Sequence, residues 1–288
     1  MSKLTKEYVT WAYRLLLDRE PENQSIIQTY KTVFQDTREL IWSFLFSEEF
    51  QINNPELKIS ITTSDGLPIP PSRLIDLVAG NISIFWFLKG GLKAKQAILD
   101  ILEKNGFNFN EFTNVLDFGC GCGRVIRNWY NYKPSFYGAD YNSELIDWCQ
   151  NNLSFCEFTV NQLEPPLGYS DNKFDFIYAL SVFTHLPRHL QIPWLKEIRR
   201  ILRPGGVVFI SVHGEHYKYL LDQKEKRLFD LGELIVHQEE IAGSNSCNAF
   251  HPNQYLINSF SKILEIIDFV PKGALGNPYQ DAILLKKL

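Results

Sequence analysis

The chain has 288 residues, of which 45% are apolar and 22% charged, a composition typical of a folded globular protein and not of a disordered one. Its 29 Lys and Arg residues against 33 Asp and Glu residues give a net charge of −4, which offers no basic surface for a nucleic-acid partner. The five cysteines are too few and too irregular for a secreted disulfide scaffold. The polar first residues and the short apolar run at 82–88 predict neither a signal peptide nor a membrane span, so we expect a cytoplasmic protein.

The first fifty residues have a helical pattern. Apolar residues recur with the spacing of one helix stripe, at Tyr8, Trp11, Ala12, Leu15 and Leu16. Glu20-Pro21 is expected to end this helix, and the pattern resumes at Ile41, Phe44 and Leu45. We predict a small all-α domain of three helices over residues 1–55, followed by a proline-rich linker at 56–71.

From residue 72 to residue 288, short β-type runs alternate with helical stripes. The expected strands are 114–118, 135–139, 157–160, 174–179, 207–212, 264–270 and 282–286, and helices are expected near 94–102, 124–130, 143–151 and 194–202. Such alternation predicts an α/β sheet that is mostly parallel and has helices on both faces. The last two strands flank a Gly/Pro-rich turn and predict an antiparallel hairpin.

The polar segment 213–250 interrupts this alternation. We predict an insertion, acting as a lid, over the carboxyl edge of the strands, where open α/β sheets bind their ligands.

A glycine-rich stretch, VLDFGCGCGRV at 115–125, leaves the first strand of the sheet. Glycine allows a tight turn and a close approach of the backbone to a ligand. A plain strand-to-helix turn needs only one glycine, whereas this loop has three. Enzymes that bind a nicotinamide dinucleotide use a similar loop, so the motif alone leaves that alternative open.

Polar residues follow the next strands of the sheet. Asp140 ends the second strand, 23 residues after Asp117 (140 − 117), where an acid can accept hydrogen bonds from both ribose hydroxyls. Asn161-Gln162 follows the third strand and is expected to bracket a purine, and Arg203-Pro204-Gly205-Gly206 precedes the fifth strand.

Together these motifs resemble the class I S-adenosylmethionine-dependent methyltransferases. The resemblance rests on VLDFGCGCGRV (115–125), YGADYN (137–142), FDFIYALSVFTHL (174–186) and LRPGGVVFISVHG (202–214), and it covers about the last two-thirds of the chain. It implies a seven-stranded Rossmann-like sheet whose last strand is antiparallel, flanked by helices, with S-adenosylmethionine as cofactor. The cofactor-binding residues that it implies are Asp117, Gly119, Cys120, Gly121, Gly123, Asp140, Tyr141, Asn161, Gln162 and Ser181.

The Cys-x-Cys at 120 and 122 is not expected to bind metal. Zinc needs four ligands, and no second Cys/His pair with suitable spacing is present in the sequence. Small side chains in a crowded loop explain the two cysteines better.

Candidate catalytic residues follow from the chemistry that the resemblance implies. Methyl transfer from a sulfonium depends mainly on alignment, and a general base is needed only when the acceptor must lose a proton, as a hydroxyl does. His213 after the fifth strand is our first candidate and His185 after the fourth strand our second, with a structural role as the alternative for each. Residues expected near the acceptor are Glu215, His216, Asn248, His251 and Tyr279.

The sequence narrows the chemical class of the methyl acceptor only in part. Methylases of this superfamily that act on amide or exocyclic nitrogens carry Asn/Asp-Pro-Pro-Tyr/Phe after the fourth strand, whereas this chain has Ala179-Leu180-Ser181-Val182-Phe183. We therefore expect O-methylation of a small molecule or a saccharide, in glycan or secondary-metabolite biosynthesis. Two alternatives stay open: a catalytically silent scaffold that binds the cofactor or its product together with a protein partner, and a nicotinamide-dependent dehydrogenase.

The N-terminal helices resemble, in part, a short domain of uncharacterised role that occurs on bacterial glycan-modifying enzymes and secreted repeat proteins. The resemblance rests on YRLLLDREP (13–21) and FLFSEEF (44–50), and the usual Gly-x-x-x-Trp between the helices is missing. An accessory bundle that forms a homodimer through these helices is the alternative.

Overall fold

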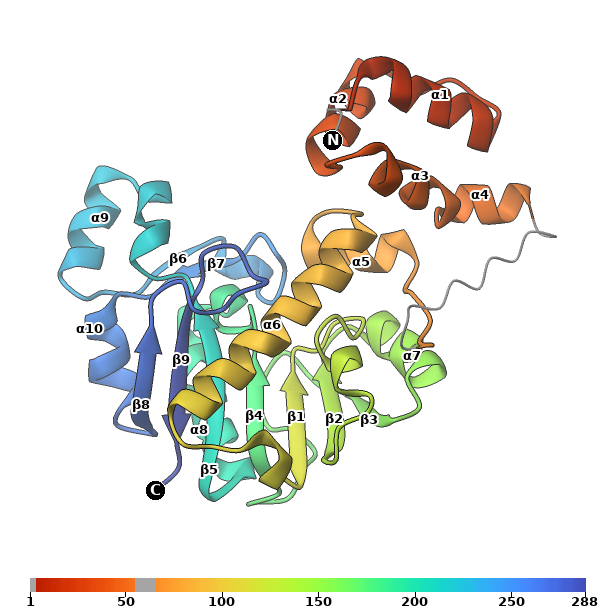
Figure 1. The fold of residues 1–288 in the computed structure, drawn as a ribbon. Coiled ribbons are helices and arrows are strands. Elements are labelled where there is room, and N and C mark those ends of the chain that lie inside the picture. Colours follow the sequence, from red (N-terminus) through yellow and green to blue (C-terminus); the bar gives the residue numbers. More distant parts are fainter. Residues whose placement is uncertain (1–3, 55–65) are drawn as a thin grey trace. The chain divides into compact units, whose positions relative to one another are not determined.

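The computed structural model describes residues 4–54 and 66–288, and the chain forms two compact units, residues 1–89 and 90–288 (Figure 1). The boundary between the units falls inside helix α6 (Ile84–Lys104). The linker expected at 56–71 lies largely outside the described residues, and the expected domain limits stay a prediction. No single helix in the described part of the chain is long and apolar enough to cross a membrane, although α5 (Ser72–Ala79) and α6 meet that test as a bent pair.

The first unit begins with four helices where the sequence predicted three. They are α1 (Lys6–Leu17), α2 (Gln24–Val33), α3 (Thr37–Leu45) and α4 (Glu48–Asn53). Each begins after a residue whose side chain accepts a backbone N–H of the first turn: Thr5, Asn23, Asp36 and Ser47. Such caps satisfy donors that a helix start leaves free, so these short polar residues fix where the four helices begin.

The stripe predicted for α1 is only partly the face that packs against the other helices, because Ala12 is buried in the core of the unit and Leu16 packs against that core. Tyr8, Trp11 and Leu15 are 43%, 54% and 75% exposed, whereas Val9 and Tyr13 are buried in the core of the unit. This helix carries apolar residues on two faces, and spacing alone does not tell which face is covered.

The second unit contains a seven-stranded sheet. Its strands are β1 (Asn114–Phe118), β2 (Ser135–Asp140), β3 (Cys156–Val160), β4 (Phe174–Ala179), β5 (Leu202–Val212), β8 (Glu265–Val270) and β9 (Asp281–Lys286). Their order is β3-β2-β1-β4-β5-β9-β8, and β9 runs antiparallel to both of its neighbours. This confirms the predicted sheet with an antiparallel last strand. The order in which successive strands are added to the sheet reverses between β1 and β4, and sheets of this kind bind ligands at such a reversal.

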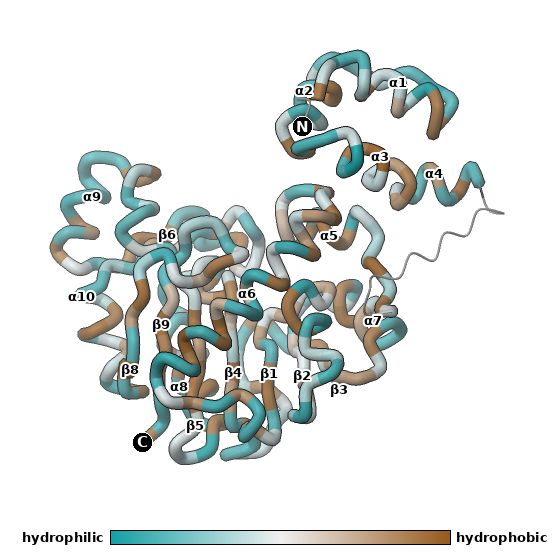
Figure 2. Tube along the Cα trace, in the orientation of Figure 1, coloured by the Kyte–Doolittle hydropathy of each residue, from teal (hydrophilic) through white to brown (hydrophobic). Residues whose placement is uncertain are grey.

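Helices cover both faces of the sheet (Figure 1). On one face, α8 (Arg188–Ile201) packs through Trp194 and Ile198 on strand residues such as Ile177. On the other face, the ring of Phe109 in η1 (Phe109–Glu111) stacks on Trp129 at 4.2 Å. Hydrophobic residues concentrate in the strands (Figure 2), as a sheet buried on both faces requires.

Two predicted element limits are wrong. In place of a helix at 124–130, the chain forms only a short 3-10 helix, η2 (Ile126–Trp129). Asn128 explains part of this, because its side-chain amide donates to the carbonyls of Arg124 and Val125 at 3.1 and 3.2 Å and so competes with helical bonds. Strand β5 begins at Leu202, so Arg203-Pro204-Gly205-Gly206 lies within the strand and its register shifts there.

The remaining helices between the strands agree more closely with the prediction. Helix α7 (Ser143–Asn152) follows β2 where a helix was predicted at 143–151, whereas η3 (Phe183–His185), which follows β4, was not predicted. After the insertion, α10 (Asn253–Tyr255) and the π-helix η6 (Leu256–Phe260) lead into β8.

The segment 213–250 forms a small substructure at the carboxyl ends of the parallel strands (Figure 1). It contains η4 (Glu215–Leu220), α9 (Gln223–Asp230), β6 (Ile235–His237), η5 (Glu239–Ile241) and β7 (Asn248–Phe250), with β6 and β7 paired antiparallel. A bridge between His213 and Phe250 brings its two ends together. Its own small core, around Phe229, holds it as a compact unit.

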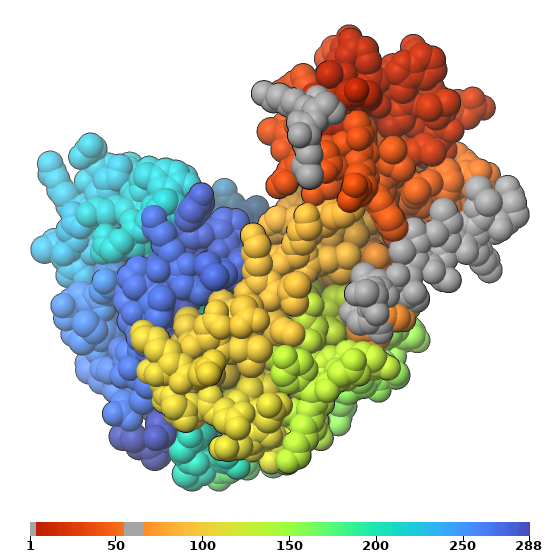
Figure 3. All heavy atoms as spheres, viewed as in Figure 1, coloured from red at the N-terminus to blue at the C-terminus, as the bar shows by residue number. Residues whose placement is uncertain are grey.

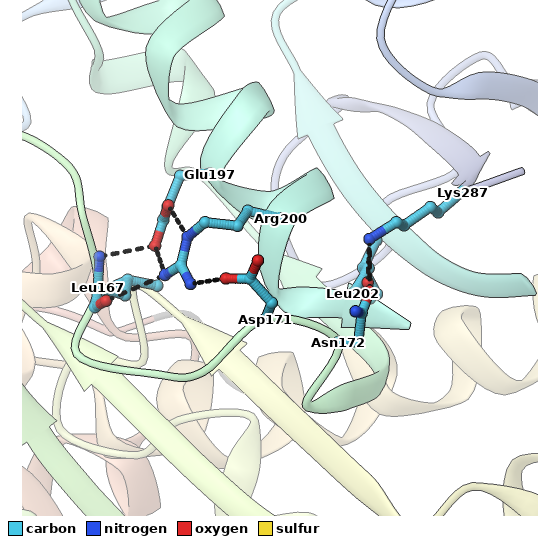
Figure 4. A network of polar contacts seen from close by, with 7 residues as sticks. All are labelled: Leu167, Asp171, Asn172, Glu197, Arg200, Leu202 and Lys287. Atoms are coloured by element: carbon cyan, nitrogen blue, oxygen red, sulfur yellow. Dashed lines mark hydrogen bonds and ion pairs between the residues drawn. The ribbon is translucent and has the colours of Figure 1, made fainter. Parts of the chain in front are cut away.

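The opposite, amino edge of the sheet is held by a polar network (Figure 4). The guanidinium of Arg200 binds the carboxylates of Asp171 and Glu197, both at 2.6 Å, and Glu197 also accepts the N–H of Leu167 at 2.8 Å. Lys287 binds the side chain of Asn172 and the carbonyl of Leu202. These contacts fix the loop before β4 at the edge opposite the glycine loop.

Candidate active site

The glycine loop lies at the carboxyl end of β1. Gly119, Gly121 and Gly123 have φ of 78°, 54° and 80°, values that side-chain-bearing residues rarely adopt. A Cβ at Gly119 would overlap the Val182 side chain, and one at Gly123 would come within 2.6 Å of Leu153. The backbone conformation and the neighbouring side chains therefore require glycine at positions 119 and 123.

Asp140 holds the glycine loop to the end of β2. Its carboxylate accepts the N–H of Gly121 and the N–H of Asn142, both at 2.9 Å. Burial raises the pKa of Asp140, while these backbone N–H groups favour the ionised form. The predicted acid thus stands beside the predicted loop.

Residues that follow β2 and β3 lie close to Asp140 and the glycine loop. The hydroxyl of Tyr141 donates to the carbonyl of Gly243 in the insertion at 3.0 Å, and its ring is 45% exposed. The N–H of Asn161 donates to the carbonyl of Asp140 at 3.0 Å, and its Oδ1 is buried without a hydrogen-bond partner among the described residues. Gln162 beside it is exposed.

Asp117 is a buried carboxyl group beneath η2. Its Oδ2 has no hydrogen-bond partner in residues 4–54 and 66–288. Burial raises the pKa of Asp117 to about 7, although the Tyr178 hydroxyl and the Arg124 guanidinium act in the opposite direction. The group is therefore partly protonated at neutral pH in the free protein.

Replacing Asp117 with asparagine is expected to change how stability depends on pH. The folded protein keeps this proton up to about pH 7, whereas the unfolded chain loses it near pH 4. The wild-type protein should therefore lose roughly 4 kcal/mol relative to the variant as pH rises from about 4 to about 7, with no further change above pH 8. Urea unfolding of both proteins across this pH range measures the difference. Parallel pH curves would contradict the buried, protonated carboxyl.

Cys120 supports the glycine loop from inside the protein. Its thiol and that of Cys149 both contact the carbonyl of Gly121, at 3.6 and 3.5 Å. Burial raises the pKa of Cys120 well above its usual value, so this thiol is a poor nucleophile. Within the described residues, no group of three or more His, Cys, Asp and Glu side chains is arranged to hold a metal ion.

His185 is a half-buried histidine in η3, directly after β4. Its Nδ1 lies 2.7 Å from the carbonyl of Cys247 in the insertion. A carbonyl only accepts, so Nδ1 carries the proton and Nε2 has a lone pair. No described residue binds that nitrogen, and burial lowers the pKa of the ring, so the neutral form can accept a proton.

His213 is more deeply buried, at 6% exposure. Its ring stacks on Tyr217 at 4.0 Å, and its Nε2 lies 3.4 Å from the side-chain nitrogen of Gln280. Burial first, and then the rings of His185 and His251, lower the pKa of His213 to about 3. A group with so low a pKa holds a proton weakly at neutral pH, which suits positioning better than base catalysis.

Sequence reasoning missed Gln280 and Ser211. Gln280 Oε1 accepts the hydroxyls of Ser211 and Ser181, at 2.7 and 3.1 Å, and the N–H of Ser181 donates to Ser211 Oγ at 2.8 Å. Ser181 has φ of 58°. The predicted Ser181 thus belongs to a buried polar network that joins β4, β5 and β9. Ser211 could have been identified as a polar residue inside the otherwise apolar strand VVFISV (207–212).

The residues predicted to contact the acceptor separate into two groups. Glu215 and Tyr279 are exposed, and His216 is partly exposed. His251 is fully buried and its Nε2 lies 3.1 Å from Gln191 Oε1, so its contacts are those of a structural residue. The side chain of Asn248 donates to the carbonyl of Ser246 at 3.0 Å and holds the 243–248 loop.

Comparison with known proteins agrees with this arrangement. A family model described as a methyltransferase domain matches residues 116–210, which span the glycine loop, Asp140 and His185. Residues 116–210 therefore belong to a methyltransferase domain. A structure of an S-adenosylmethionine-dependent methyltransferase from Mesorhizobium loti shares its fold, with a TM-score of 0.51 and 14% identity over 66% of this chain and 98% of that one.

Curated relatives of the methyltransferase domain differ in their acceptors. A probable tRNA methyltransferase 9B of Mus musculus is 31% identical over 42% of this chain, and a sterol 24-C-methyltransferase of Schizosaccharomyces pombe is 32% identical over 33% of it. The matched segments span only 25% and 26% of those proteins. The similarity therefore covers the domain and not the whole relatives.

The methyltransferase domain offers a fitting set of groups for its cofactor, S-adenosylmethionine. That molecule carries an ammonium group, two ribose hydroxyls and an adenine. The buried Oδ2 of Asp117 and Oδ1 of Asn161 are acceptors without partners among the residues described, and Asp140 ends β2 as an acid. Three acceptors for N–H and O–H donors thus lie around the switch point between β1 and β4.

Proposed function

We propose that this methyltransferase domain transfers a methyl group from S-adenosylmethionine to a hydroxyl oxygen of a small molecule or a saccharide. The observation that supports it most is the orientation of His185. An oxygen acceptor must lose its hydroxyl proton, and His185 offers a neutral Nε2 at the carboxyl end of β4.

The cofactor, when bound, supplies a methyl group already activated by a positive sulfur. The chain's own residues then have to hold the cofactor, orient the acceptor and remove the proton of its hydroxyl. Asp117 and the backbone of Gly119, Gly121 and Gly123 would hold the methionine and ribose portion, and Asp140 the ribose hydroxyls. Tyr141, Asn161 and Gln162 would bracket the adenine.

His185 and His213 take different roles in this proposal. His185 is the general base, because its Nδ1–H donates to Cys247 and leaves Nε2 available. His213 positions neighbouring groups through Tyr217 and Gln280. This reverses the order in which the sequence ranked the two histidines.

The choice of acceptor rests on the electrostatics of the insertion. Residues 213–250 contain seven Asp and Glu against four Lys and Arg, and the whole chain has a net charge of −4, a balance that does not favour binding of a phosphate backbone. We therefore infer a small acceptor and no nucleic acid.

The exposed Tyr8, Trp11 and Leu15 of α1 support the homodimer expected through the N-terminal helices, and sedimentation at two protein concentrations tests it.

Titration calorimetry with S-adenosylhomocysteine, followed by a transfer assay, tests the proposed function. We expect binding in the micromolar range, on the order of −8 kcal/mol, and mass-labelled methyl in a hydroxyl-bearing acceptor from a panel of phenols, sugars and amines. Absence of binding would reject the cofactor site. Binding without transfer to any acceptor would favour the silent scaffold, and transfer only to amines would reject oxygen as the nucleophile.

A further inference from the structure

Tyr279 is an exposed tyrosine in a strained backbone conformation. It lies in the turn between β8 and β9 with φ of 52°, and its side chain is 60% exposed although Asn277 and Gln280 beside it are buried. A bulky residue pays a steric cost for positive φ. An exposed ring contributes little packing in return, so the fold does not explain why tyrosine stands here.

Tyr279 belongs to a group of three rings that we name the ring platform: Tyr279, His216 and Tyr219. The ring of His216 lies 4.4 Å from that of Tyr279 and 5.8 Å from that of Tyr219, which is 66% exposed. Two segments distant in sequence, η4 and the turn before β9, supply these rings, and their surfaces adjoin in the space-filling view (Figure 3). The hydroxyl of Tyr217 donates to the carbonyl of Pro278 and ties the two segments together.

A continuous series of ring contacts leads from the ring platform to the candidate base. His216 contacts Tyr217 at 5.9 Å, Tyr217 stacks on His213 at 4.0 Å, and His213 meets His185 edge-to-face at 6.2 Å. The ring platform is thus connected to His185 through two intervening rings, those of Tyr217 and His213, at the same carboxyl edge of the sheet.

The openness and the polar surroundings of the ring platform indicate the class of acceptor. A planar apolar molecule gains most when both faces are buried, but Tyr219 and Tyr279 are 66% and 60% exposed and would cover a ligand from one side only. A pyranose has one C–H face suited to an aromatic ring and a rim of hydroxyls. Glu215 can accept from such hydroxyls, and the Lys272 ammonium, 5.6 Å from the Tyr279 ring, can donate to them.

We propose that the ring platform binds the pyranose ring of a saccharide acceptor, with Tyr279 as the stacking residue. This rests on the proposed function, because it names the substrate class of the same site. Tyr279 would orient the sugar so that one hydroxyl approaches His185, and it takes no part in proton transfer.

The test is saturation-transfer NMR on the full chain saturated with S-adenosylhomocysteine. The probes are methyl α-D-glucopyranoside, methyl α-D-mannopyranoside and methyl α-L-rhamnopyranoside. We expect transfer to the C–H protons of at least one pyranoside. Tyr279→Gly should weaken that binding about tenfold or more, Tyr279→Phe should retain it, and Tyr8→Ala in α1 serves as the matched exposed tyrosine.

The thermal stability of Tyr279→Gly shows whether Tyr279 stacks on a ligand or only holds the turn in which it lies. Glycine relieves the positive-φ strain but adds entropy to the unfolded chain, so Tyr279→Gly should leave Tm unchanged or raise it by up to roughly 4 °C while it weakens sugar binding. A lowered Tm would mean that the tyrosine holds the turn, and would overturn the proposal. Binding of phenols but of no pyranoside would also overturn it, with the methyltransferase function intact. Loss of S-adenosylhomocysteine binding by the wild-type protein would instead reject the proposed function itself.

Discussion

Replacing His185 with glutamine is expected to lower kcat for methyl transfer by about 100- to 10,000-fold, with affinity for S-adenosylhomocysteine unchanged. Glutamine keeps a donor for the Cys247 carbonyl but offers no nitrogen that can take up a proton. The measurement is a steady-state assay with the acceptor found in the panel, combined with calorimetry on the same variant.

The matched control is His189→Gln, because His189 is an exposed histidine on α8. It should retain wild-type kcat. Since burial lowers the pKa of His185, the acidic limb of the wild-type kcat profile should lie below pH 6.5, and it should vanish in the variant. Full turnover by His185→Gln with an oxygen acceptor would eliminate His185 as the base.

Replacing Gly119 with alanine is expected to lower the free energy of unfolding by about 2–5 kcal/mol. Two costs add: positive φ for a residue with a Cβ, about 1–2 kcal/mol, and overlap with Val182, about 1–3 kcal/mol. Cofactor affinity should fall with stability, because a shift at Gly119 would displace Gly121, whose N–H donates to the Asp140 carboxylate. Chemical denaturation and calorimetry measure the two effects.

A second substitution separates the two costs. Val182→Ala, added to Gly119→Ala, removes the overlap and should recover part of the loss, while the backbone strain stays. Gly168→Ala is the control, because a Cβ there meets nothing within 4 Å and its φ is ordinary; its effect should be close to zero. If Gly119→Ala behaved like Gly168→Ala, the steric account of the loop would be wrong.

The order of strands and the glycine loop could be predicted from the chain alone. Strands β1 and β4 match their predicted limits, because each is a short apolar run with turn residues on both sides. The loop was recognisable because three glycines in five residues exceed what a turn needs. The antiparallel end of the sheet followed from the short Gly/Pro-rich connection between β8 and β9.

Other local features depended on neighbours that the sequence pattern does not reveal. The helix predicted at 124–130 is reduced to η2, where the amide of Asn128 takes backbone carbonyls. The face of α1 that packs was predicted only in part, because this helix is apolar on two sides and only the other helices decide which residues are buried.

The sequence by itself determined the class of domain, the glycine loop and the acids beside it, because these depend on residues that are close in the chain and on the period of the strands. Only the tertiary structure shows which of the two histidines has a ring nitrogen available, and so which one we propose as the base. His185 and His213 both follow a strand, but Cys247, 62 residues beyond His185, fixes the proton on its Nδ1, while Tyr217 and Gln280 enclose His213. A histidine's tautomer and pKa depend on the groups that pack around it, and contacts across such distances in sequence leave no periodic signal.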